Sequence, residues 1–239
     1  MTAQEHPLVR WAAQAVPERG RRWDADGACV VTATGLNRRD RIVVAGEPTA
    51  AQPLVDAALA AYPDHVVLGE STLVAQLRGV AAVADFGWMD LLATEPSPVV
   101  SSSGAEWLPD AVVAPVLAAA NPGSWVQVGE PAVLGWAGAA PVHAEVAGGA
   151  PAHAEVEIAA VGALAHCAPD VAFLAGVATL PGHRGRGLST VVCAFLRDHG
   201  RRTRGTVALM VDGRNAPAIS VYTRLGFTYR AVTAARIAS

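Results

Sequence analysis

The stretch at 179–190, "TLPGHRGRGLST", has the residue types of an anion-binding corner. It lies between an apolar run, expected as a strand at 171–179, and a helical pattern that begins at Leu188. Where a strand turns into a helix, the first backbone N–H groups of the helix are free and its dipole is positive. Two glycines leave this backbone unhindered, and two arginines add donors suited to phosphate oxygens. These residues are Arg184, Gly185, Arg186 and Gly187. The corner therefore predicts a phosphate site, with pyrophosphate as the preferred ligand.

Other phosphate ligands fit this corner less well. The dinucleotide pattern GxGxxG would need a glycine where Thr190 stands, and no acidic residue follows at the distance expected for a ribose contact. The sequence has no lysine, which excludes Schiff-base chemistry and a Walker-type phosphate loop. An Arg-Gly loop that contacts RNA is a third alternative, but such segments belong to disordered tails rather than to a strand-to-helix corner.

Two motifs in this region match one family. Arg184-x-x-Gly187-x-Ser189 resembles the Arg/Gln-x-x-Gly-x-Gly/Ala signature of the GNAT superfamily of acyl-CoA-dependent N-acyltransferases, with Ser189 as a small departure. "NAPAISVYTRLGF" at 215–227 resembles the later GNAT segment Asn-x-x-Ala-x-x-Leu-Tyr-x-x-x-Gly-Phe, with Val221 in place of leucine. Because the motifs occur in order and are separated by a strand, the chain is identified as a member of this superfamily. The matching residues cover only 177–227, while the expected architecture extends from Ala132 to the C-terminus.

The resemblance implies an enzyme that transfers an acetyl group from acetyl-CoA, its co-substrate, to a primary amine by direct attack in a ternary complex. A backbone N–H of the strand would polarise the thioester carbonyl, and Tyr222 would protonate the departing thiolate. The strand before the loop would pair with pantetheine, and 185–190 would hold the pyrophosphate. The cofactor-binding residues implied in this way are Val177, Ala178, Thr179, Arg184, Gly185, Arg186, Gly187, Leu188, Ser189, Thr190 and Asn215.

No general base emerges from the sequence. Alignment on the motifs places Phe173 and Met210 where relatives often carry a glutamate, and neither can take a proton. The nearby titratable residues are expected at the surface or in turns: His166, Asp170, His183 and Asp212. Water relayed to solvent would serve an amine that is already partly neutral. The missing carboxylates also motivate an alternative function, a coenzyme-A-binding regulatory or scaffold protein without turnover.

Composition bounds the remaining function classes. Hydrophobic residues make up 52% of the 239 residues, no apolar run approaches the ~18 residues of a membrane span, and the first residues lack the order of a signal peptide. We therefore expect a cytoplasmic protein without a membrane partner. The three scattered cysteines predict buried thiols rather than a disulfide or metal framework.

The charges divide unevenly along the chain. Residues 1–183 hold 8 arginines against 19 acidic residues, and residues 184–239 hold 10 arginines against 2 aspartates. An anionic partner held by the basic lobe and a merely solvated basic face explain this equally well. The acidic remainder argues against a nucleic-acid partner.

The expected fold class is α/β (α+β), a mixed GNAT-like sheet flanked by helices. Periodicity predicts an N-terminal α/β lobe at 1–93, and composition predicts a Pro- and Ser-rich linker at 94–106. The resemblance implies that 107–239 is a GNAT-like acetyl-CoA-binding domain. Strands are expected at 40–46, 65–70, 81–89, 132–139, 155–163, 171–179, 206–211 and from 227. Helices are expected at 50–62, 71–80, 108–120 with a kink or restart at Pro115, 188–199 with Gly200 ending it, and 216–225.

The first lobe raises a hypothesis of duplication. Its β-α-β-α-β order echoes that of 171–236, but "GEPTA" after its first strand lacks the Arg-x-x-Gly-x-Gly pattern, so a degenerate copy would bind no coenzyme. Trp88 and Trp107 are candidates for walls of the acceptor site, although core filling is the favoured alternative. "PVHAEV" and "PAHAEV" at 141–156 fit a hairpin better than a metal site. The acceptor and the oligomeric state are not indicated by the sequence.

Overall fold

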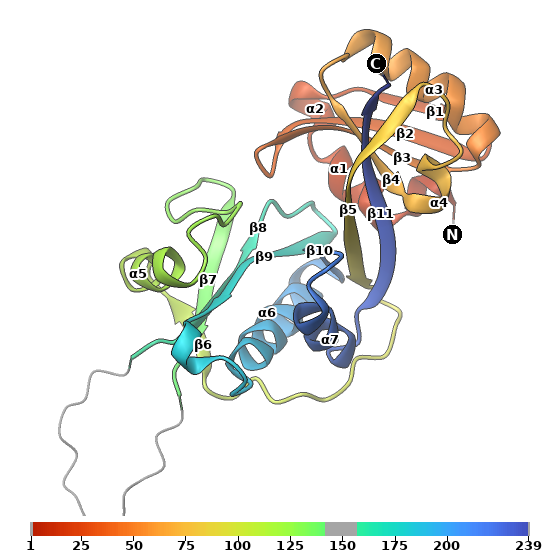
Figure 1. The fold of residues 1–239 in the computed structure, drawn as a ribbon. Coiled ribbons are helices and arrows are strands. Elements are labelled where there is room, and N and C mark those ends of the chain that lie inside the picture. The colour runs from red at the N-terminus through yellow and green to blue at the C-terminus, as the bar shows by residue number, and fades with distance from the viewer. Residues whose placement is uncertain (1, 142–156, 239) are drawn as a thin grey trace, which may run out of the picture.

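The computed structural model describes residues 2–141 and 157–238, which form a mixed sheet of eleven strands with helices on both faces (Figure 1). The strands are β1 (Arg22–Ala25), β2 (Ala28–Leu36), β3 (Arg39–Gly46), β4 (Val66–Glu70), β5 (Val80–Leu91), β6 (Ala105–Leu108), β7 (Val133–Ala139), β8 (Ala160–Ala165), β9 (Val171–Thr179), β10 (Thr206–Asp212) and β11 (Thr228–Ile237). The helices are α1 (Pro7–Ala13), α2 (Val16–Arg19), α3 (Pro48–Ala61), α4 (Ser71–Val74), α5 (Asp110–Ala120), α6 (Leu188–Arg204) and α7 (Ala216–Arg224), with short 3₁₀ turns η1 (Ala3–Glu5) and η2 (Pro181–His183). The expected fold class is confirmed.

Alternation along the strands decides which helix covers which face. On β5, Trp88 packs with α1 and its neighbour Met89 packs with α6. On β7, Trp136 packs with α5, whereas Ala137 packs with α6. Successive strand residues point to opposite faces, so α1 and α5 cover one face and α6 covers the other. Both faces carry buried apolar side chains, which explains why the central strands read as continuous apolar runs.

The two halves of the chain have the same topology. The first half runs β1-β2-β3-α3-β4-α4-β5 and the second runs β7-β8-β9-α6-β10-α7-β11. In each half, the first two pairings are antiparallel and the pairing across the long helix is parallel. This correspondence supports the hypothesis of a duplication, which remains a prediction.

The two halves exchange their last strands. The sheet order is β1-β2-β3-β4-β11-β5-β10-β9-β8-β7-β6, so β11 lies between β4 and β5, and β5 lies between β11 and β10. All the contacts of β5 and β11 with these neighbours are antiparallel. In Figure 1 the two strands run side by side at the junction of the halves. The division into 1–93, 94–106 and 107–239 stays a prediction, but the strands of the two outer regions interleave in one sheet.

Four expectations about elements need correction. The helix expected at 71–80 is only the single turn α4. The helix α6 continues past Gly200 to Arg204 and ends before Gly205, whose φ is +83°. Gly200 lies against Ala172 instead, because a Cβ there would come within 2.7 Å of the Ala172 Cβ. Pro115 does not restart the helix, because α5 continues through it from Asp110 to Ala120. Strands β1 and β2 and helix α1 had no counterpart in the sequence-based expectation.

The segment at 94–106 is attached to the second half rather than free. Arg197 on α6 is 2% exposed and donates from Nη1 to the carbonyl oxygens of Pro98 (3.2 Å) and Leu225 (3.1 Å). Arg201, one turn further on, donates from Nη2 to the carbonyls of Ala93 and Glu95. The last two residues of the segment, Ala105 and Glu106, already belong to β6.

Candidate functional site

The site begins where β9 and β10 separate. The two strands pair in parallel from Val171 opposite Thr206 to Leu174 opposite Leu209, and no pairing is found beyond this point in the described part of the chain. The remainder of β9, 175–179, pairs with β8 on its other edge only. Its inner edge therefore presents backbone groups to the opening, as a strand does when it can accept a further strand.

A bulge turns β9 at this opening. Gly176 has a φ of +64°, and a Cβ there would come within 2.7 Å of the Trp136 ring. The register between β8 and β9 shifts at the same place, between Val161 and Ala163. Glycine is required here because the backbone is left-handed and the indole occupies the space that a side chain would need.

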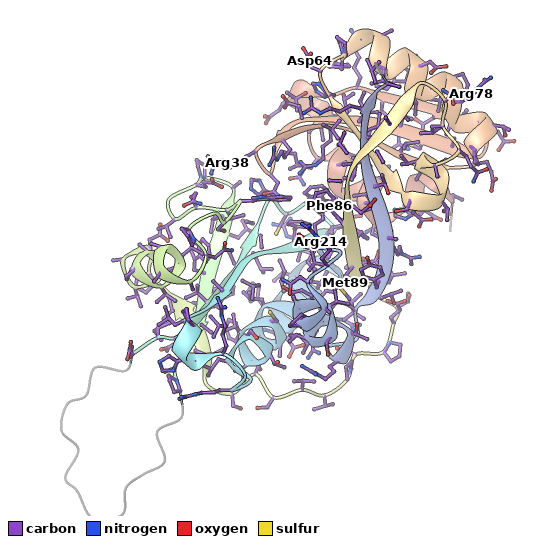
Figure 2. The ribbon with its side chains drawn as sticks, viewed as in Figure 1. Arg38, Asp64, Arg78, Phe86, Met89 and Arg214 are labelled. Atoms are coloured by element: carbon purple, nitrogen blue, oxygen red, sulfur yellow. The ribbon has the colours of Figure 1, made fainter. Side chains whose placement is uncertain are left out.

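A cavity of about 400 Å³ fills the opening. Residues of β9, β10, α7, the loop before β7 and the first half of the chain line it, among them Asn37, Phe86, Trp125, Gly176, Val177, Asp212, Asn215 and Tyr222. The cavity thus contains three of the predicted site residues, Val177, Asn215 and Tyr222. In Figure 2, Phe86 on β5 and Arg214 after β10 lie near the centre of the view, close to this opening.

The predicted phosphate corner is intact and open to solvent. Arg184 to Gly187 are exposed, Gly185 and Gly187 have φ values of +76° and +77°, and Gly187 is the N-cap of the seventeen-residue helix α6. The backbone N–H of Arg184 donates to the Pro181 carbonyl, and the next one that donates is that of Val191, to the Gly187 carbonyl. No backbone N–H from 185 to 190 donates to another described residue. Free amides at the positive end of a helix dipole are the groups that an anion site requires, and the corner stays a predicted phosphate site.

Two arginines border this corner. Arg184 donates from Nε to the Thr179 carbonyl oxygen (3.3 Å), which holds its side chain beside the end of β9. Arg186 has no ion pair or hydrogen bond with a residue in the described ranges. Most other arginines of the basic lobe have hydrogen-bond or ion-pair partners within the protein. Arg204, for example, donates to the carbonyls of Ala168 and Pro169, and Arg214 binds Asp212. Most of the basic charge of 184–239 therefore supports the fold, and Arg184 and Arg186 remain beside the corner.

Tyr222 is positioned by the short helix α7. Asn215 caps this helix, because its Oδ1 accepts the N–H of Ala218 (3.2 Å). Tyr222 is 8% exposed and its ring packs edge-on against Phe227 at 6.1 Å between centroids. Burial raises the pKa of the Tyr222 phenol well above its usual range. The phenol therefore stays protonated at every physiological pH, as a proton donor requires.

Among the described residues, none of the candidate bases is free in the cavity. Asp212 lines the cavity but accepts two hydrogen bonds from the Arg214 guanidinium, and these lower its pKa to about 2. Asp170 pairs with Arg10. His166 lies 3.8 Å from Glu130. Neither His166 nor His183 lines the cavity. Phe173 and Met210 do line it, and they contribute apolar surface only.

Neither candidate tryptophan lines the cavity, whereas a third one does, and the favoured alternative of core filling is confirmed for Trp88. Trp88 is fully buried in the core with Trp11 and Phe173. Trp107 lies on β6 against Phe195 and His199, away from the cavity. Trp125, in the loop between α5 and β7, lines the cavity and is 38% exposed. Sequence alone offered no signal to distinguish it, because its loop has no periodicity.

A second residue that the sequence analysis missed is Asn37. It forms with Arg38 the two-residue turn between β2 and β3, with φ values of +50° and +56°, which is the geometry of a type I′ hairpin. Asn37 is 3% exposed and lines the cavity. Arg38 points to the loop before β7, where its Nη1 lies 3.6 Å from Glu130 Oε1 (Figure 2). An Asn in the first turn position is a recognisable hairpin signal.

The corresponding corner of the first half cannot hold a phosphate in the same way. There β3 ends at Gly46, Glu47 caps α3 and Pro48 takes its first position. Proline removes one amide donor and glutamate repels an anion. A Cβ on Gly46 would collide with the Gly27 carbonyl, so the β1–β2 turn already occupies this space. These features agree with the expectation that a degenerate copy binds no coenzyme.

The remaining expectations concern metals, cysteines and membranes. No group of three or more His, Cys, Asp or Glu residues that could hold a metal occurs in residues 2–141 and 157–238, and the His-x-Glu repeats lie outside these residues. Cys29 and Cys193 are buried free thiols, and Cys167 is half-buried. No helix in the described ranges is long and apolar enough to cross a bilayer.

Comparisons with known proteins agree with this geometry. Residues 157–236, which include β8, β9, the phosphate corner and α7, match the family model of the FR47-like protein. No curated protein sequence is significantly similar to the chain.

Solved structures show the same fold at low sequence identity. An acetyltransferase from the GNAT family of Novosphingobium aromaticivorans DSM 12444 is 18% identical, with 98% of this chain and 100% of that chain covered and a TM-score of 0.56. A GCN5-related N-acetyltransferase from Kribbella flavida is also 18% identical, with 98% and 96% covered and a TM-score of 0.59. One from Sphaerobacter thermophilus is 15% identical, with 89% and 81% covered and a TM-score of 0.53. The chain therefore has the fold of the GNAT N-acetyltransferases, and its residues 157–236 contain an FR47-like domain related to them.

Proposed function

We propose that this protein is an N-acetyltransferase that transfers an acetyl group from acetyl-CoA to a primary amine in a ternary complex. One observation carries the proposal: the strand edge at 175–179 connects a corner of free amides to a cavity of about 400 Å³ that contains a buried phenol. The corner fits a pyrophosphate, the edge fits the amides of pantetheine, and the cavity fits a thioester beside an amine.

Acetyl-CoA supplies the activated acetyl group, and the amine displaces its thiol. Residues of the chain have three tasks in this transfer. Amides at 185–190, with Arg184 and Arg186, bind the pyrophosphate. The backbone of β9 near Val177 orients the pantetheine arm and offers an N–H to the carbonyl oxygen, where negative charge grows as the C–N bond forms. Tyr222 donates its proton to the sulfur as the C–S bond breaks.

The amine must lose its own proton without a free carboxylate in the described part of the cavity. Asp212, the one acidic residue lining it there, is held by Arg214. We propose that water takes this proton, so that the rate follows the fraction of amine that is neutral. An amine with a low pKa should then react faster at pH 7 than one with a high pKa.

The lack of a free carboxylate in the described part of the cavity also favours the alternative, a coenzyme-A-binding protein without turnover. Such a protein keeps the phosphate corner and the strand edge but has no path for the amine proton. Hydrolysis-corrected release of coenzyme A from acetyl-CoA with a panel of primary amines separates the two. Release with at least one amine supports the enzyme, and coenzyme binding without release supports the alternative.

Binding itself is tested by thermal unfolding with and without excess acetyl-CoA. A ligand present at about 100 times its dissociation constant stabilises the native state by about 2.7 kcal/mol. The wild type should show this shift, and the double variant Arg184→Ala, Gly187→Asp should not, because one positive charge is lost and the new carboxylate repels the anion at the helix N-terminus. Arg202→Ala, an exposed arginine in the last turn of the same helix, is the control and should keep the shift. No shift in the wild type would refute the proposal.

A further inference from the structure

The cavity has a second compartment with a different chemistry. A hollow of about 190 Å³ adjoins it, since Phe86, Trp125 and Met210 line both. Three arginines line this second hollow: Arg39, Arg41 and Arg236. Asp40 is its one acidic lining residue among those described, and Asp40 Oδ1 accepts the N–H of Gly35. The hollow is therefore a positively charged end of the cavity, separated from Tyr222 by an apolar section.

Arg41 is the most informative of these arginines. It is 5% exposed, and its Nη1 donates to the carbonyl oxygen of Leu36. No carboxylate of residues 2–141 or 157–238 forms an ion pair with it. A buried cation without an ion pair is costly, and the positive charge of Arg39 adds to the cost. The charge of Asp40 and the Trp11 ring, whose centroid lies 5.9 Å from the central carbon of the guanidinium, offset part of it. Such a group binds an anion more strongly than an exposed arginine would.

Asn37 supplies an independent observation in the first compartment. Its side chain is buried and lines the cavity, and its Oδ1 has no hydrogen-bond partner in the described ranges. A buried carbonyl oxygen that lacks a donor destabilises the protein, so a ligand that brings an N–H is favoured. Asn37 and Arg41 come from the same hairpin of the first half, whereas Tyr222 and the phosphate corner belong to the second half.

We propose that the acceptor is a primary amine that also carries a carboxylate, with an apolar segment between the two groups. Arg41 and Arg39 bind the carboxylate, the apolar segment lies along Phe86, Trp125 and Met210, and Asn37 Oδ1 accepts a hydrogen bond from an N–H of the acceptor. The polar groups that select the acceptor therefore come from the first half of the chain, its apolar wall comes from both halves, and the second half binds acetyl-CoA. This inference rests on the proposed function, because it names the substrate class of the same site.

The test compares matched pairs of amines that differ only in charge. Each pair is an amino acid and its carboxamide, for example 4-aminobutyrate and 6-aminohexanoate with their amides. We expect kcat/KM for the best acid to exceed that for its amide by about 10- to 100-fold, the range for a hydrogen-bonded charged group. Arg41→Gln and Arg39→Gln should each reduce this ratio toward one. Arg38→Gln is the matched control, because Arg38 belongs to the same turn, faces Glu130 and lines neither compartment.

The second hairpin residue gives a further test, since Arg41 is buried and its replacement can unfold the protein. Asn37→Gly keeps the left-handed turn and removes Oδ1, so it should raise KM for the acid without changing KM for acetyl-CoA. Equal use of acid and amide by the wild type, or a preference that survives both arginine variants, would overturn the inference. So would acetyl-CoA binding without turnover of any acid in the panel. If acetyl-CoA produces no thermal shift, the proposed function itself fails, and this result is distinguishable from the others.

Discussion

The guanidinium of Arg39 lies over the indole of Trp125, with its central carbon 5.4 Å from the ring centroid. Arg39 begins β3 in the first half of the chain, and Trp125 lies in the loop before β7 in the second half. A cation–π contact at an exposed site contributes about 0.5–1 kcal/mol, too little to hold the halves together. The contact instead positions two side chains: Trp125, which lines both compartments of the cavity, and Arg39, which lines the second one. The candidate acceptor site is thus built from both halves.

Replacing Tyr222 with phenylalanine should separate chemistry from binding. The ring keeps its packing against Phe227, and only the proton donor is lost. We expect kcat to fall roughly 100-fold or more, as for other general acids, while the thermal shift with acetyl-CoA persists. Tyr229→Phe, at a tyrosine that is 40% exposed on β11, is the control and should leave kcat unchanged. Equal loss of turnover and coenzyme binding would contradict the acid role.

Gly176→Ala should distort the edge of β9. The added Cβ would come within 2.7 Å of the Trp136 ring, in a backbone conformation that alanine rarely adopts. We expect a loss of roughly 1–3 kcal/mol in the free energy of unfolding, measured by urea denaturation, and a higher KM for acetyl-CoA. Gly182→Ala is the matched control, because nothing lies within 4 Å of its added Cβ and its φ is not positive. A variant with unchanged stability and unchanged KM would show that the bulge is not needed.

His6 should make stability depend on pH. Burial lowers the pKa of this imidazole below 6.5, while the hydrogen bond with Glu70 opposes the shift in part, and the nearby charges of Arg230 and Asp90 also act on it. As the pH falls, His6 therefore becomes protonated in the unfolded chain before it does in the folded protein. The stability due to neutral His6 is complete above pH 6.5 and is lost as pH falls through the lower folded pKa.

His6→Asn tests this dependence, because asparagine can still accept the N–H of Leu8 at the start of α1. Thermal midpoints measured between pH 7.5 and pH 5 should fall less steeply than in the wild type. Some slope should remain, since burial also lowers the pKa of His166. His199→Asn serves as the control, at a ring that packs against the surface residue Trp107. An unchanged slope in His6→Asn would refute the assignment.

Arg197→Met should be strongly destabilising, although it removes a charge whose burial is itself costly. Methionine keeps much of the stem, but the carbonyls of Pro98 and Leu225 lose their shared donor. We expect the free energy of unfolding to decrease by about 2–4 kcal/mol, as for a broken buried charged network. The same change at exposed Arg202 should cost far less. Similar urea midpoints for the two variants would mean that the segment at 94–106 is not held by Arg197.

The phosphate corner and its flanking elements could be predicted because their signals are local. Helix α6 has apolar residues at helical spacing, Gly185 and Gly187 mark the turn, and Asn215 with Tyr222 marks α7. The end of α6 was misplaced because a glycine within a helix can serve close packing, as Gly200 does against Ala172. A glycine alone does not distinguish these two uses.

The acceptor side could not be predicted, because it is made by contacts between residues far apart in the chain. Asn37, Phe86 and Trp125 reach one cavity only through the exchange of β5 and β11 and the placement of two loops. Strand β2 was missed although Asp26 and Gly27 form a hairpin signal just before it. Its side chains are buried on both faces, so the strand shows no alternation.

The exchange of β5 and β11 also limits when each half of the protein can fold during synthesis. When the ribosome has released β4 and β5, the strand that must lie between them is still more than a hundred residues away in the sequence. The nascent first half therefore waits with two unpaired strand edges, and sequence-distant pairing of this kind is slow and exposed to aggregation. Neither half can complete its own sheet, so folding finishes only when Thr228–Ile237, the eleventh strand in chain order, inserts between β4 and β5.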